Sequence, residues 1–300
     1  MAGMTHASQA GRRPPVTASA GRPAATVEAA LDAAAALLAG AGALLVCAGA
    51  GMGVDSGLPD FRGDAGFWRA YPPYERLGLS FVELADPVHF RDDPTLAWGF
   101  YGHRLGLYRA TRPHEGFAVL RRWGARLPGG MYVFTSNVDG QFQRAGIDAV
   151  AEVHGSIHHL QCVGPCGGEI WPADGVEVDV DPETMRAGEP LPRCPSCGDL
   201  ARPNILMFGD GSWVSERTDA ALRTCESWLD EVTGPGDAGP LVVVEIGAGT
   251  AVPTVRRTAE SLAGRLIRIN PAQPEIRPGA GVSLPLAALP ALTALAARLP

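Results

Sequence analysis

Four apolar runs, each followed at once by glycine or by polar side chains, constrain the fold of this chain more than any other feature of its sequence. The runs are "ALLVCAGA" from residue 43, "GMYVFTSNVDG" from 130, "PLVVVEIGAGT" from 240 and "GRLIRINP" from 264. Short continuous apolar runs are typical of strands buried on both faces of a parallel sheet. Helical stretches such as "HEGFAVLRRWGARL" and "VPTVRRTAESLAG" lie between them. The sequence therefore predicts an α/β fold with a Rossmann-like, doubly wound parallel sheet.

The residues that end these runs indicate where a ligand binds, because ligands of such sheets lie beyond the carboxyl ends of the strands. After the first run come Gly49, Gly51 and Gly53, and "GAGMG" is one residue shorter than the dinucleotide pattern G-x-G-x-x-G. Two interpretations stay open: a tight turn, or bare backbone that approaches a pyrophosphate. In "PDFR", the side chains of Asp60 and Arg62 either serve such a ligand or form a surface ion pair.

Composition excludes several classes of protein. Hydrophobic residues make up 46% of the chain, which is ample for a buried core. The formal net charge of −7 argues against a direct nucleic-acid partner, which would need a basic face. No apolar run approaches the roughly 18 residues that a membrane span requires. Residues 1–26 are rich in Ala, Gly, Pro and Arg without the apolar region of a secretory signal, and we expect a disordered tail there.

Four of the six cysteines fall in two close pairs, and this spacing predicts a metal site. Cys162-x3-Cys166 and Cys194-x2-Cys197 are flanked by turn formers, as in "GPCGG" and "CPSCG". Two such pairs complete the tetrahedral shell of a zinc ion, and four thiolates leave no open position for water, so the zinc would be structural. Free thiols clustered by chance are the alternative. Paired thiols of this kind, with no disulfide framework, fit a reducing, cytoplasmic compartment.

Three polar residues near the second run form a candidate catalytic group. Asn137 and Asp139 follow that run directly, and His154 lies in "EVHGS" a short way on, so all three can face one pocket. A neutral imidazole near pH 7 can accept a proton from a hydroxyl group. A lone histidine is otherwise a core or surface residue, and we interpret His158 and His159 in that way.

At this point the sequence resembles the sirtuins, the NAD-dependent protein deacylases. The motifs that carry the resemblance are "GAGMGVDSGLPDFRG", "TSNVDGQFQRAG", "EVHGS", the two cysteine pairs, "RPNILMFGD", "EIGAG" and "RIN", which occur in this order between residues 27 and 295. The resemblance implies that NAD is a co-substrate and that acyl-lysine proteins are the partners. It implies a reaction in which the acyl oxygen attacks C1′ of the ribose as nicotinamide leaves, His154 deprotonates a ribose hydroxyl, and O-acyl-ADP-ribose and free lysine are released.

The same resemblance implies a set of binding residues. Asn137 and Asp139 would organise the nicotinamide end of NAD, and Asn270 would reach the adenosine ribose. The implied cofactor-binding residues are Gly49, Ala50, Gly51, Asp60, Phe61, Arg62, Ser136, Asn137, Asp139, Gly247, Ala248, Gly249 and Asn270. The implied substrate-binding residues are Tyr101, Arg104, Ile205, Leu206, Phe208 and Gly209.

Tyr101 and Arg104, in "WGFYGHR", resemble the Tyr-x-x-Arg pair of the desuccinylase and demalonylase branch of the family. Residues i and i+3 share a face of a helix, so the two side chains can jointly hold a terminal carboxylate. The alternative is an amphipathic helix with a solvated arginine and a half-buried tyrosine. The helix itself is predicted over residues 90–110.

The sequence also departs from the family pattern. Gly53 stands where the glycine loop usually has Ser, Ser136 replaces Gln, Phe142 replaces His, and Asp210 replaces Glu. "GAG" at Gly247–Gly249 replaces "GTS", which removes two hydroxyl groups, although backbone amides still bind phosphate. Two alternatives to a deacylase therefore stay open: an ADP-ribosyltransferase or NAD glycohydrolase on the same fold, and a non-catalytic NAD or ADP-ribose binding module.

The pattern of elements and inserts divides the chain into segments. After the tail, the Rossmann-like NAD domain would be assembled from three stretches, interrupted by a helical insert with the cofactor loop and by the zinc-binding module. The predicted segments are the Rossmann-like stretches 27–63, 111–158 and 202–300, the helical insert 64–110 and the zinc module 159–201.

Overall fold

A parallel six-stranded sheet organises the part of the chain that the structure describes. The computed structural model describes residues 24–60, 63–164, 166–236, 239–262 and 264–299. Within these ranges the strand order is β11-β10-β9-β1-β2-β3, and every neighbouring pair is parallel. This confirms the predicted α/β, doubly wound class. The strands are β1 (Ala43–Ala48), β2 (Met131–Thr135), β3 (Val150–Glu152), β9 (Leu241–Ile246), β10 (Leu266–Ile269) and β11 (Gly281–Leu284).

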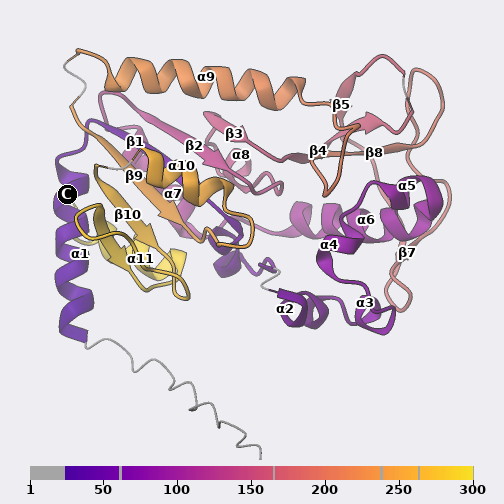
Figure 1. The fold of residues 1–300 in the computed structure, drawn as a ribbon, viewed down its shortest axis with the longest axis horizontal. Coiled ribbons are helices and arrows are strands. Elements are labelled where there is room, and N and C mark those ends of the chain that lie inside the picture. Colours follow the sequence, from indigo (N-terminus) through magenta and orange to yellow (C-terminus); the bar gives the residue numbers. More distant parts are fainter. Residues whose placement is uncertain (1–23, 61–62, 165, 237–238, 263, 300) are drawn as a thin grey trace, which may run out of the picture.

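Helices cover both faces of this sheet (Figure 1). In β1, Leu44 and Val46 pack on one face, whereas Leu45 and Cys47 pack on the other, because successive side chains of a strand alternate. The first face is covered by α1 (Ala24–Ala39), α7 (Glu115–Gly124) and α11 (Ala288–Ala296), and the second by α9 (Glu216–Thr233) and α10 (Thr254–Ser261). Burial on both faces explains why β1 has no polar side chain.

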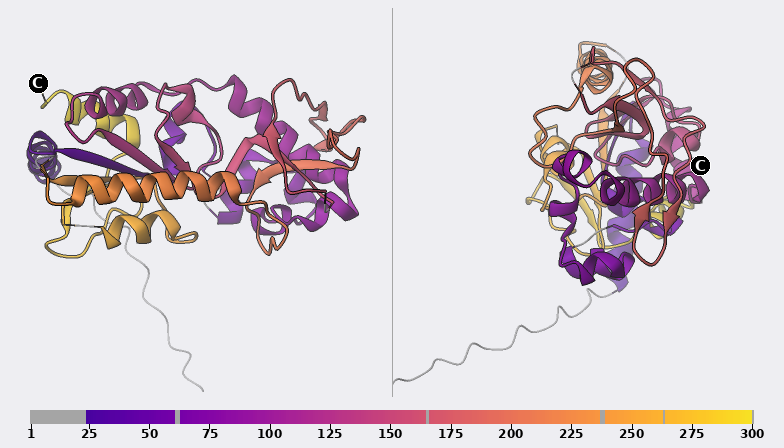
Figure 2. Two further views of the ribbon diagram at one scale, coloured as in Figure 1. Left: turned by 90° about the horizontal axis from the view of Figure 1, so that it is seen from above. Right: turned by 90° about the vertical axis from the view of Figure 1, so that its right-hand side faces the viewer.

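A second lobe lies beyond one end of the sheet and combines the two segments that break the strand–helix pattern (Figures 1 and 2). Trp98 and Phe100 from the first segment share one apolar cluster with Leu160 and Ala201 from the second. Neither segment buries this surface alone, so the helical insert and the cysteine-bearing module form one core. The helices are α2 (Gly63–Ala70), α3 (Pro72–Arg76), α4 (Phe81–Leu84), α5 (Val88–Asp92) and α6 (Pro94–Ala110), and the strands are β4 (Gly155–Cys162), β5 (Ile170–Pro172), β6 (Val180–Asp181), β7 (Arg186–Ala187) and β8 (Ala201–Ile205).

Three short helices complete the described elements, and one predicted helix is corrected. They are η1 (Ala50–Met52) and η2 (Val54–Ser56) after β1, and α8 (Gln141–Arg144) after β2. The prediction of one helix over residues 90–110 is wrong at its start, because α5 and α6 are separate. Asp93 ends α5 and caps α6, accepting the Leu96 amide at 3.2 Å, and Pro94 occupies the first position of α6.

Two further expectations concern the N-terminal tail and membrane-spanning helices. Most of the predicted disordered tail, residues 1–23, lies outside them, and α1 already begins at Ala24. Among the helices that the structure does describe, none combines the length and the apolar character needed to cross a membrane.

Candidate functional site

Two glycine loops touch at the carboxyl edge of the sheet and form the floor of the candidate site. The Gly51 amide donates to the Gly247 carbonyl at 3.1 Å. A Cβ atom on Gly51 would lie 2.6 Å from Cα of Gly247, and one on Gly49 would lie 2.8 Å from Cα of Ala248. Only glycine permits this approach. The loops follow β1 and β9, where the strand order reverses, which is the ligand-binding position of doubly wound sheets. This bare backbone therefore fits the pyrophosphate of a dinucleotide.

The polar end of β2 joins the same floor. The Ser136 amide donates to the Ala48 carbonyl at 3.3 Å, and Asn137 Nδ2 donates to the Gly49 carbonyl at 3.0 Å. Parallel pairing of β1 with β2 brings the two strand ends together. The structure thus assembles two of the predicted cofactor residues on the first glycine loop.

Asp139 lies just beyond, in a buried turn. Its Oδ1 accepts the Gln141 amide at 2.9 Å. Burial raises the pKa of Asp139 to about 6, with a smaller contribution from the negative charge of Glu152, whereas Arg104 opposes the shift. The carboxyl group therefore changes charge close to neutral pH.

His158 positions this turn, a role that the sequence did not indicate. Its Nε2 lies 2.9 Å from the Asp139 carbonyl, which can only accept, so we assign the proton to Nε2. A Cβ on Gly140, whose φ is +68°, would meet the His158 ring at 2.6 Å. The only sequence signal is the turn glycine after Asp139, and it does not identify its partner.

His154 lies between β3 and β4, beside the predicted substrate stretch. Its carbonyl accepts the Leu206 amide at 2.9 Å, and the Ile157 amide donates to the Val138 carbonyl at 3.0 Å, which ties the His154 turn to the loop of Asn137 and Asp139. Burial lowers the pKa of His154, so its imidazole is neutral at pH 7. A neutral, half-buried ring is the form that can accept a proton.

The stretch after β8 presents apolar side chains beside His154. Ile205 is buried at the end of β8, whereas Leu206 and Phe208 are each 37% exposed, and Gly209 turns the chain with a φ of +67°. Beneath it, the buried Asp210 carboxylate pairs with both Nη atoms of Arg202 at 2.7 and 3.0 Å. The shorter acid at position 210 therefore still anchors this turn.

Tyr101 and Arg104 are both buried on α6, so neither the solvated arginine nor the half-buried tyrosine of the alternative interpretation is observed. The Arg104 guanidinium carbon lies 5.7 Å from the Tyr101 ring centroid. Nε and Nη2 of Arg104 donate to the hydroxyl of Tyr108 at 3.0 and 2.8 Å. Tyr108, one turn further along α6, is a partner that the sequence analysis missed although the i,i+4 spacing indicates it.

A cavity of about 300 Å³ opens between α6 and the loop after η2. Its walls include Leu58 and Pro59 from that loop, His103 and Leu107 from α6, and Tyr71. Asp60, at the end of the described stretch, is half-buried, and the predicted cofactor residues Phe61 and Arg62 lie outside the described residues.

Asn270, which the family resemblance assigns to the adenosine ribose, has its side-chain amide engaged by the main chain. Its Nδ2 donates to the Ala248 carbonyl at 2.9 Å, and its Oδ1 accepts the amides of Ala272 and Gln273, each at 3.0 Å. The side chain is nearly inaccessible, with 3% exposed. Asn270 thus joins the loops that follow β9 and β10.

Phe142 and Gly53, two departures from the family pattern, both contribute to packing in the interior. Phe142 is buried and lies edge-on to Phe117, with ring centroids 5.0 Å apart. A Cβ on Gly53 would lie 3.1 Å from Cδ1 of Leu58, so the missing side chain admits this leucine.

The two cysteine pairs meet beside the end of β4, where Cys162 lies. The four sulfur atoms of Cys162, Cys166, Cys194 and Cys197 lie within 4.8 Å of one another. Those of Cys162 and Cys197 are 3.6 Å apart, and those of Cys166 and Cys194 are 3.3 Å apart. Thiolates around a tetrahedral zinc ion lie about 3.8 Å apart, so this donor set fits structural zinc.

Comparison with known proteins gives one consistent family. The model of the Sir2 family matches residues 49–229. The NAD-dependent protein deacylase of Aquifex aeolicus is 33% identical over 205 residues, which are 66% of this chain and 77% of that protein. The NAD-dependent protein deacylase 1 of Archaeoglobus fulgidus is 31% identical over 245 residues, 78% and 84% of the two chains. Sirtuin-5 of Danio rerio, a mitochondrial NAD-dependent protein deacylase, is 34% identical over 197 residues, 60% and 62%.

Solved structures agree with this result. The crystal structure of a Sir2 homologue in complex with NAD superposes with a TM-score of 0.65 at 25% identity, covering 90% of this chain and 93% of the other. A Sir2 homologue in complex with ADP-ribose gives a TM-score of 0.64 at 25% identity, covering 88% and 94%.

We predict that the purified protein carries about one zinc ion per chain and that Cys194→Ala loses it. Metal binding at such a site is coupled to folding, so the variant should also unfold at a lower temperature. Cys225→Ala, at a buried thiol outside the cluster, is the control and should retain the metal. Elemental analysis and thermal unfolding measure both quantities, and full zinc content in Cys194→Ala would refute the assignment.

We predict that Asp139→Asn stabilises the protein at pH 7.5. The pKa of Asp139 is raised to about 6 in the folded protein, so the folded state holds this proton more tightly than the unfolded state does. The free energy of unfolding therefore falls as pH rises from the unfolded pKa to the folded pKa. Asparagine keeps an oxygen that accepts the Gln141 amide but carries no charge. The free energy of unfolding at pH 7.5 should therefore increase by about 1–3 kcal/mol. Urea unfolding at pH 7.5 and pH 4.5 checks this, since the gain in unfolding free energy should fall to about a third at the lower pH. An equal effect at both values would contradict it.

Proposed function

This chain belongs to the Sir2 family, and we propose from that premise that it is an NAD-dependent protein-lysine deacylase. The reaction transfers the acyl group of a lysine to ADP-ribose and releases nicotinamide. The observation that carries the proposal is the 2.9 Å hydrogen bond between the His154 carbonyl and the Leu206 amide, because it holds the candidate base beside an exposed apolar strand end. The glycine floor lies at the ligand edge of the same sheet.

Different residues of the site are assigned to different parts of NAD. Bound NAD supplies an electrophilic ribose carbon and a leaving group. Gly49, Gly51 and Gly247 allow the two loops to approach, and their own amides donate to the carbonyls of Ile246, Gly247 and Ile269. The phosphates are therefore assigned to the amides of Ala50, Ala248 and Gly249, since loop and helix amides attract phosphate. In this proposal Ser136, Asn137 and Asp139 serve the nicotinamide end and Asn270 the adenosine ribose. The family resemblance assigns the covering of the nicotinamide end to Asp60, Phe61 and Arg62.

His154 accepts the proton of a ribose hydroxyl. Its burial keeps the imidazole neutral at pH 7, and its main chain is fixed to the substrate stretch. Ile205, Leu206, Phe208 and Gly209 provide the edge along which an extended peptide lies, since their stretch follows a strand and exposes two apolar side chains.

Cys162, Cys166, Cys194 and Cys197 would hold a structural zinc ion in this lobe. Cys162 ends β4, which pairs with β8 immediately before the substrate stretch. Zinc bound by the four thiols therefore holds the strand that delivers the peptide-binding edge, and reduced thiols of this kind suit a cytoplasmic location.

We further propose that acidic acyl groups, such as succinyl and malonyl, are the preferred substrates. Arg104 places a buried guanidinium beside Tyr101, and Tyr108 fixes its orientation by two hydrogen bonds. Burial makes a guanidinium–carboxylate contact stronger than it is in water. The resemblance of Tyr101 and Arg104 to the Tyr-x-x-Arg pair of the desuccinylase and demalonylase branch supports this assignment.

Mass spectrometry of the nucleotide product separates the deacylase from its alternatives. O-acyl-ADP-ribose formed from NAD and acyl-lysine peptides identifies a deacylase. Plain ADP-ribose would identify an NAD glycohydrolase, an ADP-ribosylated protein a transferase, and unchanged NAD a binding module.

We predict that His154→Ala binds NAD normally but removes acyl groups at a rate lower by roughly two or more orders of magnitude, the usual effect of losing a general base. The ring acts on a hydroxyl group and not on the phosphates, so affinity is spared. Steady-state rates together with NAD titration measure the two effects, and near-normal turnover would show that another group accepts the proton.

We predict that Arg104→Met lowers the ratio of succinyl-lysine to acetyl-lysine efficiency. Loss of the guanidinium leaves the carboxylate of the acyl chain desolvated and unpaired, at a cost of roughly 2–5 kcal/mol. Acetyl-lysine has no such charge and is the internal control. Values of kcat/KM for both peptides give the ratio, and an unchanged ratio would assign acyl selectivity to other residues of the 64–110 segment.

A further inference from the structure

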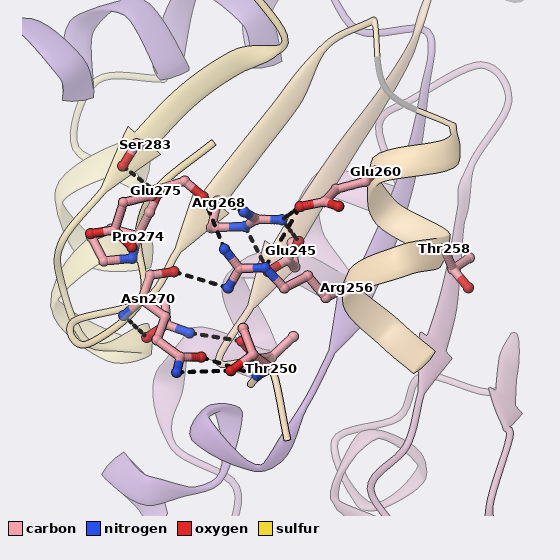
Figure 3. A network of polar contacts seen from close by, with 12 residues as sticks. Glu245, Thr250, Arg256, Thr258, Glu260, Arg268, Asn270, Pro274, Glu275 and Ser283 are labelled. Atoms are coloured by element: carbon pink, nitrogen blue, oxygen red, sulfur yellow. Dashed lines mark hydrogen bonds and ion pairs between the residues drawn. The ribbon is translucent and has the colours of Figure 1, made fainter. Parts of the chain in front are cut away.

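Three consecutive carbonyls between β10 and β11 accept hydrogen bonds from the side chains of Arg256 and Ser283 (Figure 3). We call residues 271–275 the strap. Arg256 Nη1 donates to the Gln273 carbonyl at 3.1 Å, and its Nη2 donates to the Glu275 carbonyl at 2.9 Å. Ser283 Oγ donates to the Pro274 carbonyl at 2.6 Å. An arginine fork that spans two carbonyls fixes both the position and the orientation of the strap.

A buried charge pair anchors the strap to the sheet. Arg268 of β10 donates to both carboxylate oxygens of Glu245 of β9, at 2.8 and 2.6 Å, and neither side chain is exposed. Arg268 also contacts Glu260 of α10 at 2.8 Å and the Glu275 carbonyl. Because removing either charge would leave the other buried and unpaired, this arrangement is rigid.

Gln273 of the strap connects it to the second glycine loop. Gln273 Oε1 accepts the Thr250 amide at 3.1 Å, and its Nε2 donates to Thr250 Oγ1 at 3.1 Å. Asn270 forms a second connection between the strap and this loop, since it accepts the Gln273 amide and donates to the Ala248 carbonyl. The loop of Gly247, Ala248 and Gly249 is therefore held by side chains that lie outside it.

We infer that Arg256 is a positioning residue for the nucleotide half of the site. It acts through the strap and Gln273 and holds the 247–250 loop in the geometry that receives the diphosphate of an ADP-ribose group. The inference rests on the proposed function for the identity of that ligand. A loop with alanine and glycine at its centre has no hydroxyl there to bind phosphate, so its amides must be held in place from outside.

The next residue of α10 offers a matched control. Arg257 has the same charge on the same helix and is exposed, and its side chain makes no hydrogen bond or ion pair with any residue in the described ranges. Arg256→Met and Arg257→Met therefore remove equal charge, and only the first removes bonds to the strap.

The test is calorimetric titration of the whole protein with ADP-ribose, which requires no catalysis. Arg256→Met and the half-exposed Gln273→Ala should each weaken binding about tenfold, whereas Arg257→Met should stay within about twofold of wild type. Arg256→Lys keeps the charge but not the fork, and it should bind as weakly as Arg256→Met. In turnover assays, KM for NAD should rise in Arg256→Met and Gln273→Ala, while kcat and KM for the peptide stay constant.

Hydrogen exchange provides the second readout. The amides of Thr250 and Gln273 should lose protection in Arg256→Met and keep it in Arg257→Met. Equal ADP-ribose affinity in the two methionine variants, or full recovery in Arg256→Lys, would overturn the inference. Wild-type protein that binds ADP-ribose without removing acyl groups would refute the proposed function alone, and wild-type protein that fails to bind ADP-ribose would refute both.

Discussion

The contact between the glycine loops after β1 and β9 is the constraint on which the rest of the site depends. It brings Cα of Gly51 and Gly247 too close for any side chain, and it lies at the reversal point of the strand order. Asn137 bonds to the first loop and Asn270 to the second, so both polar strand ends take their places from this contact. A nucleotide bound there meets amides from two strands that are adjacent in the sheet but far apart in sequence.

The sequence predicts the parallel sheet, the ligand edge and the metal cluster well because each depends on local patterns. Continuous apolar runs mark strands buried on both faces, and close cysteine pairs mark knuckles. The prediction of one helix over residues 90–110 misses the break at Asp93, although an aspartate followed by proline is a signal for the start of a helix. The predicted cofactor residues meet at one edge because of the strand order β11-β10-β9-β1-β2-β3. Local sequence patterns do not determine that order.

Buried polar partners could not be predicted in this way. Glu245 and Arg268 stand alone in apolar strands, and a charge inside a central strand indicates only that some partner exists. Which partner depends on strand register, and register depends on the whole sheet. The same holds for the contact of His158 with Asp139, since the two lie nineteen residues apart and meet through the turn at Gly140.

The departures from the family pattern are best understood through these long-range contacts. Loss of two hydroxyl groups at Ala248 and Gly249 would appear to weaken phosphate binding if the loop acted alone. In this chain Gln273 engages both the amide and the hydroxyl of Thr250, and Asn270 holds the Ala248 carbonyl. The backbone geometry of this loop is thus set by a neighbouring segment that is itself tied to a buried ion pair. A motif that lacks its usual side chains can therefore still bind its ligand when the surrounding structure fixes its backbone.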